Sequence, residues 1–493
     1  MKLKVKNLNW VAGRPVAFLH EETAKKLNIF ANDRVEISSP VRVHAIIDIF
    51  SKVVKRDEIG LSHELSKIVG LKNNQKIEIA SSELSQATFL IRKKIAGKKL
   101  SKSELEFLIS EIVHNNLSEA EIAYFTAAEK LNGMSYDEII NLTRAMVKTG
   151  ARLRFGKKFV VDKHCIGGIA GNRTTPIVVS ICACEKGLVF PKTSSRAITS
   201  AAGTADVVET VSNVELSIEQ IKKVVKKTGA CLAWGGSLGL APSDDKIIRV
   251  ERLLNLDIEA QLLASIMSKK ISAGAKYLLI DIPYGPGSKE PNLKGAKELG
   301  SKFSKIAKAF GIKLKVVYTD GSQPIGNGFG PSLEMLDILK VLRNSEDAPV
   351  DLREKSIFLA SEIFKMCGFS SPKKRAREIL VSGRALEKFE EIVNAQNGRP
   401  DFLKRVAKIR LGRVRRTIYS KKTGRIVRIG NKEINGLCRI LGTPETAPAG
   451  VYLHKHLEKV KKKEPLMTLY TESRYKLLDA LSFLEKNNPI KIR

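Results

Sequence analysis

The sequence predicts a multidomain α/β protein, with an N-terminal β-rich domain, a helical domain, a central α/β sheet domain and a C-terminal α+β domain. The chain has 493 residues, of which 43% are hydrophobic, so it is long enough for about three domains with cores of their own. The hydrophobic period changes along the chain between that of strands and that of helices. Two polar, glycine-containing loops each follow a predicted strand, as in sheets that bind ligands at their carboxyl edge.

The N-terminal part changes from a strand period to a helix period. Residues 1–84 contain alternating segments such as 34–37 and 76–79, which predict a small β-rich domain. Residues 88–156 place apolar side chains at i, i+3, i+4 and i+7, and this pattern predicts a helical domain. The residues of that face are Leu105, Leu108, Ile109 and Ile112.

The rest of the chain divides at a polar break. Residues 157–393 alternate strands, such as 277–282 and 313–317, with helices, which predicts a central α/β sheet. Beyond the break, residues 401–493 contain further alternating strands, including 425–429, and predict a β-rich C-terminal domain.

The first polar loop runs from Lys163 to Thr175 and follows a predicted strand at 159–162. It combines cations, the imidazole of His164 and three glycines, and it leads into a helix that begins near Pro176. Helix N-termini favour anions, so phosphate is the expected ligand. The spacing fits neither the P-loop nor the dinucleotide fingerprint.

The second polar loop, residues 191–206, follows a predicted strand at 188–190 and is rich in hydroxyl side chains. By itself it is explained equally well by a Ser/Thr-capped turn. Two such loops at strand ends in one α/β region favour a shared phosphate site.

A third segment, residues 257–270, predicts a helix that Asp257 caps. Asp257, Gln261, Ser265 and Lys269 follow one another at steps of four, which gives a polar stripe. The simplest interpretation of the stripe is the solvated face of an amphipathic helix.

Charge indicates anionic ligands. Lys and Arg number 85 against 52 Asp and Glu, a formal net charge of +33 at pH 7. Such a charge attracts phosphate, nucleotides and nucleic acids alike. Basic clusters at 413–416 and 461–463 leave RNA binding open, but no aromatic stacking motif accompanies them, so we expect no nucleic-acid partner.

The cysteine and hydropathy patterns indicate the cellular compartment in which the protein is expected. Six Cys and seven His show no metal-ligand spacing, so free thiols and no metal site are expected. The N-terminal residues lack the apolar core of a signal peptide, and the longest apolar stretch, near 177–184, is too short to cross a membrane. A cytoplasmic protein without a membrane partner is the expectation.

Taken together, these segments resemble the family of pyrimidine nucleoside and AMP phosphorylases. The similarity runs through residues 163–168, 194–204 and 264–270, and it extends to 322–326 and 330–334. It covers nearly the whole chain, and the ordered set of motifs is far more specific than any one of them.

Within the family, the chain is similar to the archaeal AMP phosphorylases. Its second loop lacks the Gly- and His-rich pattern of thymidine phosphorylases, and their base-holding Arg falls on Val250 here, with Arg249 and Arg252 nearby. Cys165 replaces the Ser that is usual in the first loop, and a thiol is a poorer hydrogen-bond partner for phosphate.

The resemblance also implies how the domains are used. Residues 1–84 correspond to an extra domain of AMP phosphorylases, which implies a homodimer or a larger homo-oligomer. The helix near 257–270, within about 240–272, is expected to complete the helical domain of residues 88–156. Residues 157–393 then form the phosphate-binding domain.

The implied activity is phosphorolysis of AMP, and of CMP and UMP, in nucleotide breakdown or salvage. Inorganic phosphate, the co-substrate, attacks C1′ of the ribose, and free base and ribose 1,5-bisphosphate are the products. No metal or organic cofactor is implied. A thymidine or pyrimidine nucleoside phosphorylase is the alternative, and an RNA-binding protein on an inactive scaffold is a more distant one.

Asp257 is implied as the proton donor to the leaving base, which requires a raised pKa. His164 is the rival acid, because its ordinary pKa lies near neutrality. Ser265 and Lys289 are expected to contact substrate, as is Lys269, for which an ion pair is an equally simple role. The other expected phosphate and substrate contacts come from the two loops, at Gly168, Ser194, Ser195, Arg196, Ala197, Ile198, Thr199 and Thr204.

Overall fold

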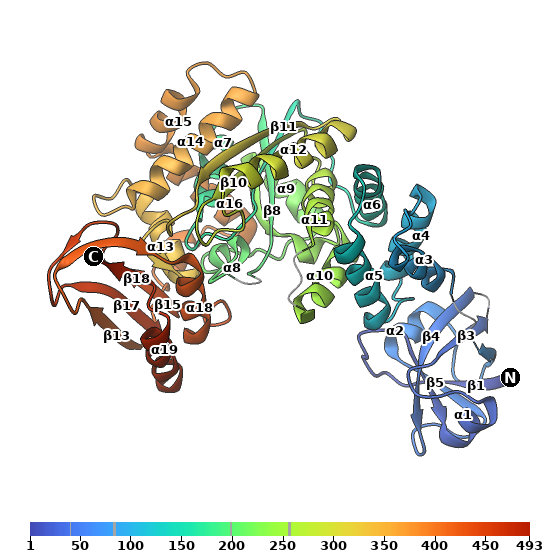
Figure 1. Cartoon of the computed structure of the whole chain (residues 1–493). Coiled ribbons are helices and arrows are strands. Elements are labelled where there is room, and N and C mark those ends of the chain that lie inside the picture. The colour runs from blue at the N-terminus through green and yellow to red at the C-terminus, as the bar shows by residue number, and fades with distance from the viewer. Residues whose placement is uncertain (40, 82–84, 198–199, 255–257) are drawn as a thin grey trace. The chain divides into compact units, whose positions relative to one another are not determined.

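The computed structural model describes residues 1–39, 41–81, 85–197, 200–254 and 258–493 (Figure 1). The chain forms two compact units. One unit comprises Met1–Thr149 and Pro242–Leu262, and the other comprises Gly150–Ala241 and Leu263–Arg493. Along the chain, the predicted order of a β-rich domain, a helical domain, an α/β sheet domain and an α+β domain is confirmed.

The N-terminal residues form a closed barrel with strand order β1-β5-β2-β4-β3-β6. Alternation sends every second side chain inward, so residues such as Val35, Ile37, Ile77 and Ile79 are fully buried, as the strand period predicts. The strands are β1 (Lys2–Asn7), β2 (Val16–His20), β3 (Arg34–Ser39), β4 (Val41–Phe50), β5 (Glu58–Leu61) and β6 (Lys76–Ser81), with helices α1 (Glu21–Leu27) and α2 (His63–Val69).

The helical domain contains α3 (Gln86–Ile95), α4 (Lys102–Val113), α5 (Glu119–Asn132) and α6 (Tyr136–Thr149). Ser101 and Ser118 begin α4 and α5 with capping boxes, and the predicted apolar face of α4 is fully buried. Helix α10 (Pro242–Leu254) packs on α4, α5 and α6. The Lys246 ammonium donates to the carbonyls of Ile112 and Val113 at 2.8 and 2.6 Å, and burial lowers its pKa to about 8.

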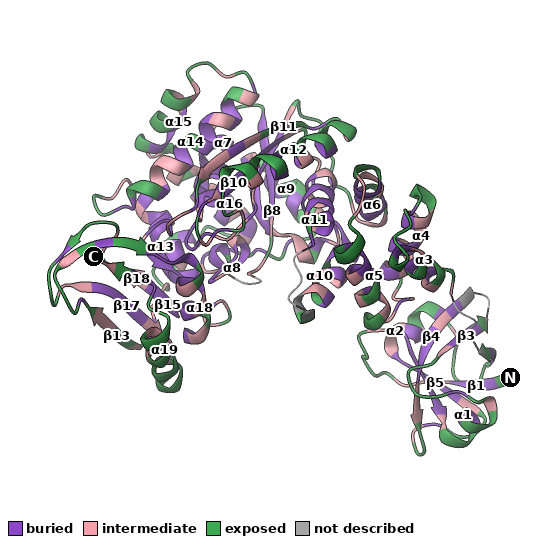
Figure 2. Ribbon diagram, in the orientation of Figure 1, coloured by how far each residue is buried: buried purple, intermediate pink, exposed green. Residues whose placement is uncertain are grey.

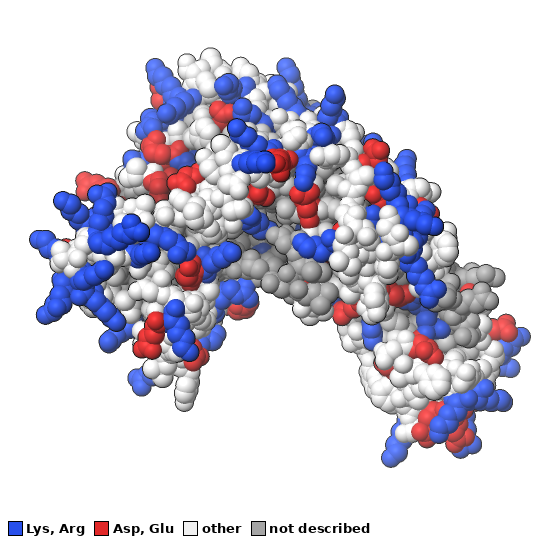
Figure 3. All heavy atoms as spheres, in the orientation of Figure 1, with Lys and Arg blue, Asp and Glu red and all other residues white. Residues whose placement is uncertain are grey.

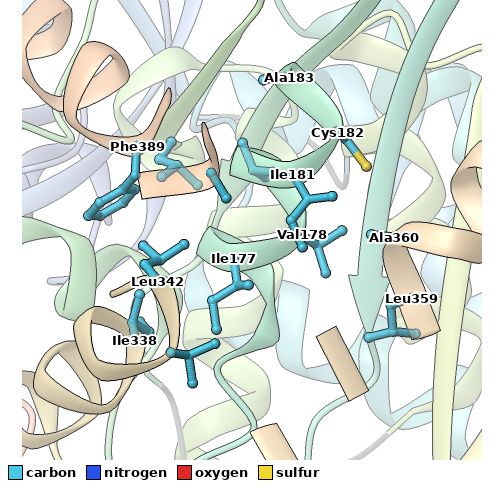
Figure 4. Close-up of a cluster of buried hydrophobic side chains, with 14 of the residues drawn as sticks. Ile177, Val178, Ile181, Cys182, Ala183, Ile338, Leu342, Leu359, Ala360 and Phe389 are labelled. Carbon is cyan, nitrogen blue, oxygen red and sulfur yellow. The ribbon is translucent and has the colours of Figure 1, made fainter. Parts of the chain in front are cut away.

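The central domain is a parallel sheet in the order β11-β10-β7-β8-β9. Buried apolar side chains cover it, and those of α7, α13, α14 and α16 interdigitate in the largest core (Figures 2 and 4). The strands are β7 (Phe159–Cys165), β8 (Leu188–Ser194), β9 (Ala230–Trp234), β10 (Tyr277–Tyr284) and β11 (Lys313–Asp320). The helices are α7 (Thr174–Ala183), α8 (Thr204–Glu209), α9 (Ile218–Thr228), α11 (Glu259–Ser272), α12 (Leu293–Ala309), α13 (Pro331–Leu342), α14 (Val350–Met366), α15 (Pro372–Val381) and α16 (Arg384–Asn397), with a 3-10 turn at Gly235–Leu238.

Strand β8 is longer than the sequence predicts. The second polar loop was expected from Pro191, yet the strand continues through Ser194 and pairs with β9 along that length. The Phe190 N–H donates to Gly229 on the β9 side, so the missing N–H of Pro191 lies on the β7 side, where pairing has ended at Val189. A proline is tolerated where no ladder donor is needed.

The C-terminal domain is α+β and contains two sheets, ordered β12-β15-β17-β13 and β16-β14-β18. Its own core includes Ile434, Leu437 and Leu469, all fully buried. The strands are β12 (Gly328–Phe329), β13 (Val414–Tyr419), β14 (Gly424–Ile429), β15 (Gly450–Leu453), β16 (Lys459–Val460), β17 (Pro465–Thr471) and β18 (Ile490–Ile492), and the helices are α17 (Phe402–Val406), α18 (Asn431–Leu441) and α19 (Arg474–Lys486).

All six cysteines are free thiols, and four of them are buried. In the described part of the chain, no helix has the length and apolar character needed to cross a membrane.

Candidate active site

The glycine-rich loop joins β7 to α7 at the carboxyl edge of the central sheet. Gly168 and Gly171 have φ angles of 90° and 67°, in the left-handed region. A Cβ at Gly168 would lie 2.9 Å from the backbone N of Lys289, and one at Gly171 would lie 2.1 Å from the carbonyl O of Ile325. Close packing therefore requires glycine at both positions, and it brings Gly168 beside Lys289, two of the predicted site residues.

The N-terminus of α7 faces this loop without a capping side chain. Lys163, fully buried on β7, donates from Nζ to Thr174 Oγ1 at 2.8 Å and to Thr175 Oγ1 at 3.4 Å. Burial lowers the pKa of Lys163, and the charge of Asp281 opposes this shift only in part. Backbone donors at a helix end and a buried ammonium group together form an anion site.

Two further buried lysines share one carboxylate. Asp162 of β7 pairs with Lys192 Nζ at 3.2 Å and with Lys270 Nζ at 2.9 Å. Both ammonium groups also approach the carbonyl of Thr193, at 2.7 and 3.3 Å. Burial, reinforced by the charge of Lys270, lowers the pKa of Lys192 far below its ordinary value despite the attraction of Asp162. The cluster thus contains two lysine side chains and one carboxylate, and burial disfavours the charged form of Lys192.

A third buried pair lies on the neighbouring strand. Asp281 of β10 accepts a hydrogen bond of 2.6 Å from Thr319 Oγ1 and pairs with Lys355 Nζ at 3.3 Å. Burial acts to raise the pKa of Asp281, but the charges of Lys355 and Lys163 hold it below its ordinary value. Asp281 is thus an anion that partly offsets the charge of Lys163.

The hydroxyl-rich loop begins at Ser194, at the end of β8. The Ser194 hydroxyl is buried and has no hydrogen-bond partner within the described ranges, whereas Ser195 is exposed. Asp206 holds the loop by accepting the backbone N–H groups of Ala197 and Gly203, both at 2.7 Å. The unsatisfied Ser194 hydroxyl remains available to a ligand.

Two arginines hold this loop through hydrogen bonds and ion pairs. Arg173 donates to Glu334 Oε2 at 2.6 Å and to Thr204 Oγ1 at 3.2 Å, so the Thr204 hydroxyl already has a partner. Arg196 was predicted to present its guanidinium to phosphate, but it is engaged by carboxylates and lies over the Trp234 ring at 4.7 Å. Its carboxylate partners are Asp206, Glu209 and Glu215. Arg196 therefore holds the loop in this structure, and its contact with phosphate stays a prediction.

His164 lies on β7 two residues after Asp162 and therefore on the same face of the strand. Burial lowers its pKa well below 6.5, and the charges of Lys270, Lys192, Lys163 and Lys269 lower it further. The imidazole is consequently neutral near pH 7.

The remaining predicted site residues differ in how far they are buried, and three of them lie outside the described residues. Ser265 and Lys269 are half-buried on α11, and the Lys289 side chain is exposed. Ile198, Thr199 and Asp257 lie outside the described residues.

Helix α18 of the C-terminal domain holds both loops, a feature that sequence reasoning missed. Asn431 Oδ1 accepts the Ala170 N–H at 3.0 Å, and one turn later Asn435 Oδ1 accepts the Ala201 N–H at 2.9 Å. Asn431 also donates to the Gly321 carbonyl at 3.0 Å. Asn431 is 1% exposed, so these bonds are shielded from water.

Sequence reasoning also passed over the buried charges. Asp162, Lys163, Lys192 and Lys270 were read as members of a strand, a loop or a helix rather than as site residues. The available signal was the presence of charges within otherwise apolar strands, since lysine and aspartate are rarely buried unless paired. Among the described residues, no group of three or more His, Cys, Asp and Glu side chains could hold a metal ion.

Two family models and many relatives match this chain. Residues 89–150 match the helical bundle domain of a glycosyl transferase family, and residues 157–257 match its a/b domain. An AMP phosphorylase of Pyrococcus furiosus is 41% identical, with 100% of this chain and 98% of the relative covered. AMP phosphorylase 1 of Archaeoglobus fulgidus is 39% identical, with 100% and 97% covered. The chain belongs to the AMP phosphorylase family.

The AMP phosphorylase fold is shared with distant enzymes. Anthranilate phosphoribosyltransferase from Thermus thermophilus superposes with a TM-score of 0.51 at 20% identity, over 62% of this chain and 98% of that one. The Saccharomyces cerevisiae enzyme of the same name, in complex with PRPP and Mg, gives 0.52 at 14% identity, over 64% and 99%. These matches show that somewhat under two thirds of this chain shares its fold with both enzymes.

Proposed function

We propose that this member of the AMP phosphorylase family cleaves the glycosidic bond of AMP with inorganic phosphate at the carboxyl edge of its central sheet. The observation that carries this proposal is the excess of buried lysine side chains over carboxylates there. Lys163, Lys192 and Lys270 lie around the ends of β7 and β8, where Asp162 pairs with two of them. A phosphate dianion supplies the negative charge that these lysines lack.

Phosphate binds at the N-terminus of α7. Lys163 and the hydroxyls of Thr174 and Thr175 surround this position, and the orphaned hydroxyl of Ser194 adds a donor from β8. The Gly168 backbone N–H contributes from the glycine-rich loop. Ser195, Thr199 and Thr204 complete the hydroxyl set, with Thr204 exchanging its bond from Arg173 for one to the ligand.

The leaving base is protonated by Asp257. Support for Asp257 over His164 comes from the low pKa of the imidazole, which carries too little proton at pH 7 to act as an acid. Neutral His164 can still donate a hydrogen bond to the substrate from one ring nitrogen.

The substrate is a nucleoside 5′-monophosphate, and the products are free base and ribose 1,5-bisphosphate. Lys289, which lies beside Gly168, reaches the 5′-phosphate, and Ser265 with Lys269 holds the ribose and base. CMP and UMP are substrates in addition to AMP, because the described part of the site contains hydroxyl and ammonium donors rather than a purine-specific group. No organic or metal cofactor takes part.

The assembly is a homodimer or larger homo-oligomer in which the N-terminal barrel takes part. The barrel carries large apolar side chains at the surface, including Trp10 at 49% and Val11 at 78% exposure, which supports their burial against another copy. Six free thiols support a reducing cytoplasm as the site of the reaction.

A pyrimidine nucleoside phosphorylase is the second candidate, because both activities share the phosphate site. The deciding difference is the 5′-phosphate of the substrate. Release of free base is measured with AMP, CMP, UMP, adenosine and thymidine, each with and without inorganic phosphate. Release from the monophosphates alone, and only with phosphate, is expected; equal or faster release from thymidine would assign the alternative.

The same assay on Asp257→Asn tests the proton donor. Base release from AMP should fall by about 100-fold or more, as expected for loss of a general acid. Glu259→Gln, which removes an exposed carboxylate at the start of α11, serves as the control and should leave the rate unchanged.

A further inference from the structure

The C-terminal domain carries a disproportionate share of the positive charge. Residues 401–493 contain 23 Lys and Arg against 8 Asp and Glu, a surplus of 15 out of the +33 of the whole chain. Blue side chains accordingly gather over the C-terminal domain in Figure 3. None of the buried lysines of the active site belongs to this set.

Two turns concentrate this charge. The turn at residues 420–423 and the turn at 461–464 are joined by backbone bonds, from Ser420 N to the Glu464 carbonyl at 2.9 Å and from Lys463 N to the Ser420 carbonyl at 2.8 Å. A third bond runs from Lys462 N to Thr423 Oγ1 at 3.1 Å. Five exposed lysines are thereby held together, namely Lys421, Lys422, Lys461, Lys462 and Lys463, which we call the lysine turns.

The lysine turns lack compensating acids. None of the five ammonium groups forms an ion pair within the described part of the chain, and the Glu464 carboxylate accepts the backbone N–H of Lys461 at 2.8 Å. Beside the turns, Arg425 lies directly opposite Lys459 in the pairing of β14 with β16. Like charges opposite one another destabilise a sheet, so this surface gains stability when an anion covers it.

The distribution of charge indicates a polymer as the partner. The five lysines are spread over an exposed surface, so one small anion cannot contact them all, whereas a phosphodiester chain neutralises them in succession. Tyr419 ends β13 directly before the first turn and is 55% exposed, so its ring is available for stacking on an unpaired base. Stacking favours single-stranded nucleic acid over an acidic protein or a lipid surface.

We propose that the lysine turns and Tyr419 form a binding surface for single-stranded RNA, remote in the sequence from the phosphate loops. From the sequence, no nucleic-acid partner was expected, because no aromatic stacking motif accompanies the basic clusters; the fold joins the two turns and places Tyr419 directly before one of them. Turnover of RNA also releases nucleoside 5′-monophosphates, the substrates proposed above, but the surface is argued from its own residues and does not depend on that function.

The test measures binding of the full-length protein to a labelled, unstructured RNA of about 20 nucleotides by fluorescence anisotropy, with excess AMP and no phosphate. Replacing all five lysines of the turns by alanine should weaken binding by at least tenfold. Each phosphate contact contributes roughly 0.7 to the slope of log affinity against log salt, so loss of the five lysines should flatten this slope by up to about 3.5. Tyr419→Ala should weaken binding severalfold, whereas Tyr124→Ala, at an exposed tyrosine of α5, should not.

A matched variant removes the same charge elsewhere: Lys186, Lys222, Lys223, Lys226 and Lys227, all exposed, are replaced by alanine. Equal loss in both five-lysine variants would show that net charge alone drives binding and would overturn the proposal. Equal or tighter binding of polyglutamate or phosphatidylserine vesicles would overturn RNA as the partner. Because all the replaced side chains are exposed, both variants should keep the native unfolding midpoint. Measuring the unfolding midpoint of each variant checks this.

Discussion

At the scale of single residues, the site depends on charges that the protein buries at a cost. Taking a lysine out of water is unfavourable unless a partner compensates, and Lys163, Lys192 and Lys270 have fewer carboxylate partners than ammonium groups. Packing holds such a cluster in place, and under the proposed function we expect it to become more stable when phosphate binds. The same charges keep His164 neutral, which separates its role from that of an acid.

Asp162→Asn tests the buried cluster. The change leaves Lys192 and Lys270 without their common carboxylate, so the unit that contains them should lose about 3–5 kcal/mol of unfolding free energy. The measurement is calorimetric unfolding near neutral pH. Asp57→Asn, at a surface ion pair with Lys4 whose side chains are 59% and 47% exposed, is the control and should cost less than about 1 kcal/mol. Equal effects would show that the Asp162 cluster is not a buried charge centre.

Glu129 provides a pH-dependent test at the same scale. It is buried on α5, where its carboxylate accepts a hydrogen bond of 2.9 Å from Gln261, and burial raises its pKa to about 8. Glu251 and Glu138 raise the pKa further, whereas Gln261 and Lys94 oppose the shift. Because the folded protein binds this proton more tightly than the unfolded chain, stability falls as pH rises from about 4.5 toward 8 and then levels.

The expected loss attributable to Glu129 is about 2 kcal/mol between roughly pH 5.5 and 7.5. Calorimetric unfolding of the native protein and of Glu129→Gln over this pH range isolates the contribution of Glu129 to the unfolding free energy, since the amide cannot ionise. Glu119→Gln, on the exposed start of α5, should retain the native pH dependence. A Glu129→Gln profile parallel to that of the native protein would refute the buried, protonated carboxyl.

At the scale of elements, the two phosphate loops are positioned by a helix from another domain. Asn431 and Asn435 lie one turn apart on α18, and each accepts a backbone N–H from a different loop. This arrangement fixes the distance between the glycine-rich and hydroxyl-rich loops without using their side chains. The Ser194 hydroxyl, which has no partner within the described ranges, is not used by these contacts.

Asn431→Ala is therefore expected to raise KM for phosphate by about tenfold, because it removes the buried hydrogen bond to Ala170 of the first loop and a second one to the Gly321 carbonyl. Steady-state kinetics with varied phosphate measure this change. Lys432→Ala, at the exposed neighbouring position of α18, should leave KM unchanged. A native KM in Asn431→Ala would show that the loop keeps its position without α18.

How far the sequence predicts these features depends on the range of the interaction. The face of α4 and the barrel alternation follow from local period, so residues such as Leu108 and Ile37 could be assigned as core directly. The glycine-rich loop could be found because its glycines and cations are contiguous. The bonds of Asn431 could not, since its partners lie far away in sequence, and neither could the ion pairs of Arg196 with Glu209 and Glu215, which come from beyond the loop.

At the scale of the whole molecule, the N-terminal barrel adds a surface that the reaction itself does not require. Trp10 and Phe50 make an edge-to-face contact at 6.2 Å while remaining 49% and 38% exposed. Exposed aromatic side chains next to Val11 favour burial against another chain.

Replacing Trp10 and Val11 together by serine should reduce the mass of the assembly measured by light scattering, because the substituted surface no longer excludes water. Replacement of the exposed residues Leu478 and Tyr475 of α19 by serine is the matched control, and the mass should stay native. An unchanged mass in the barrel variant would assign assembly to another surface.

The central claim is that phosphate itself becomes bonded to the ribose. The most direct measurement incubates the protein with AMP and inorganic phosphate labelled with ¹⁸O, and identifies the sugar product by mass spectrometry. Phosphorolysis should yield adenine together with a ribose that carries two phosphoryl groups, of which the one at C1 holds the label. Ribose 5-phosphate without label would show hydrolysis, and it would contradict the assignment of the buried lysines to a phosphate nucleophile.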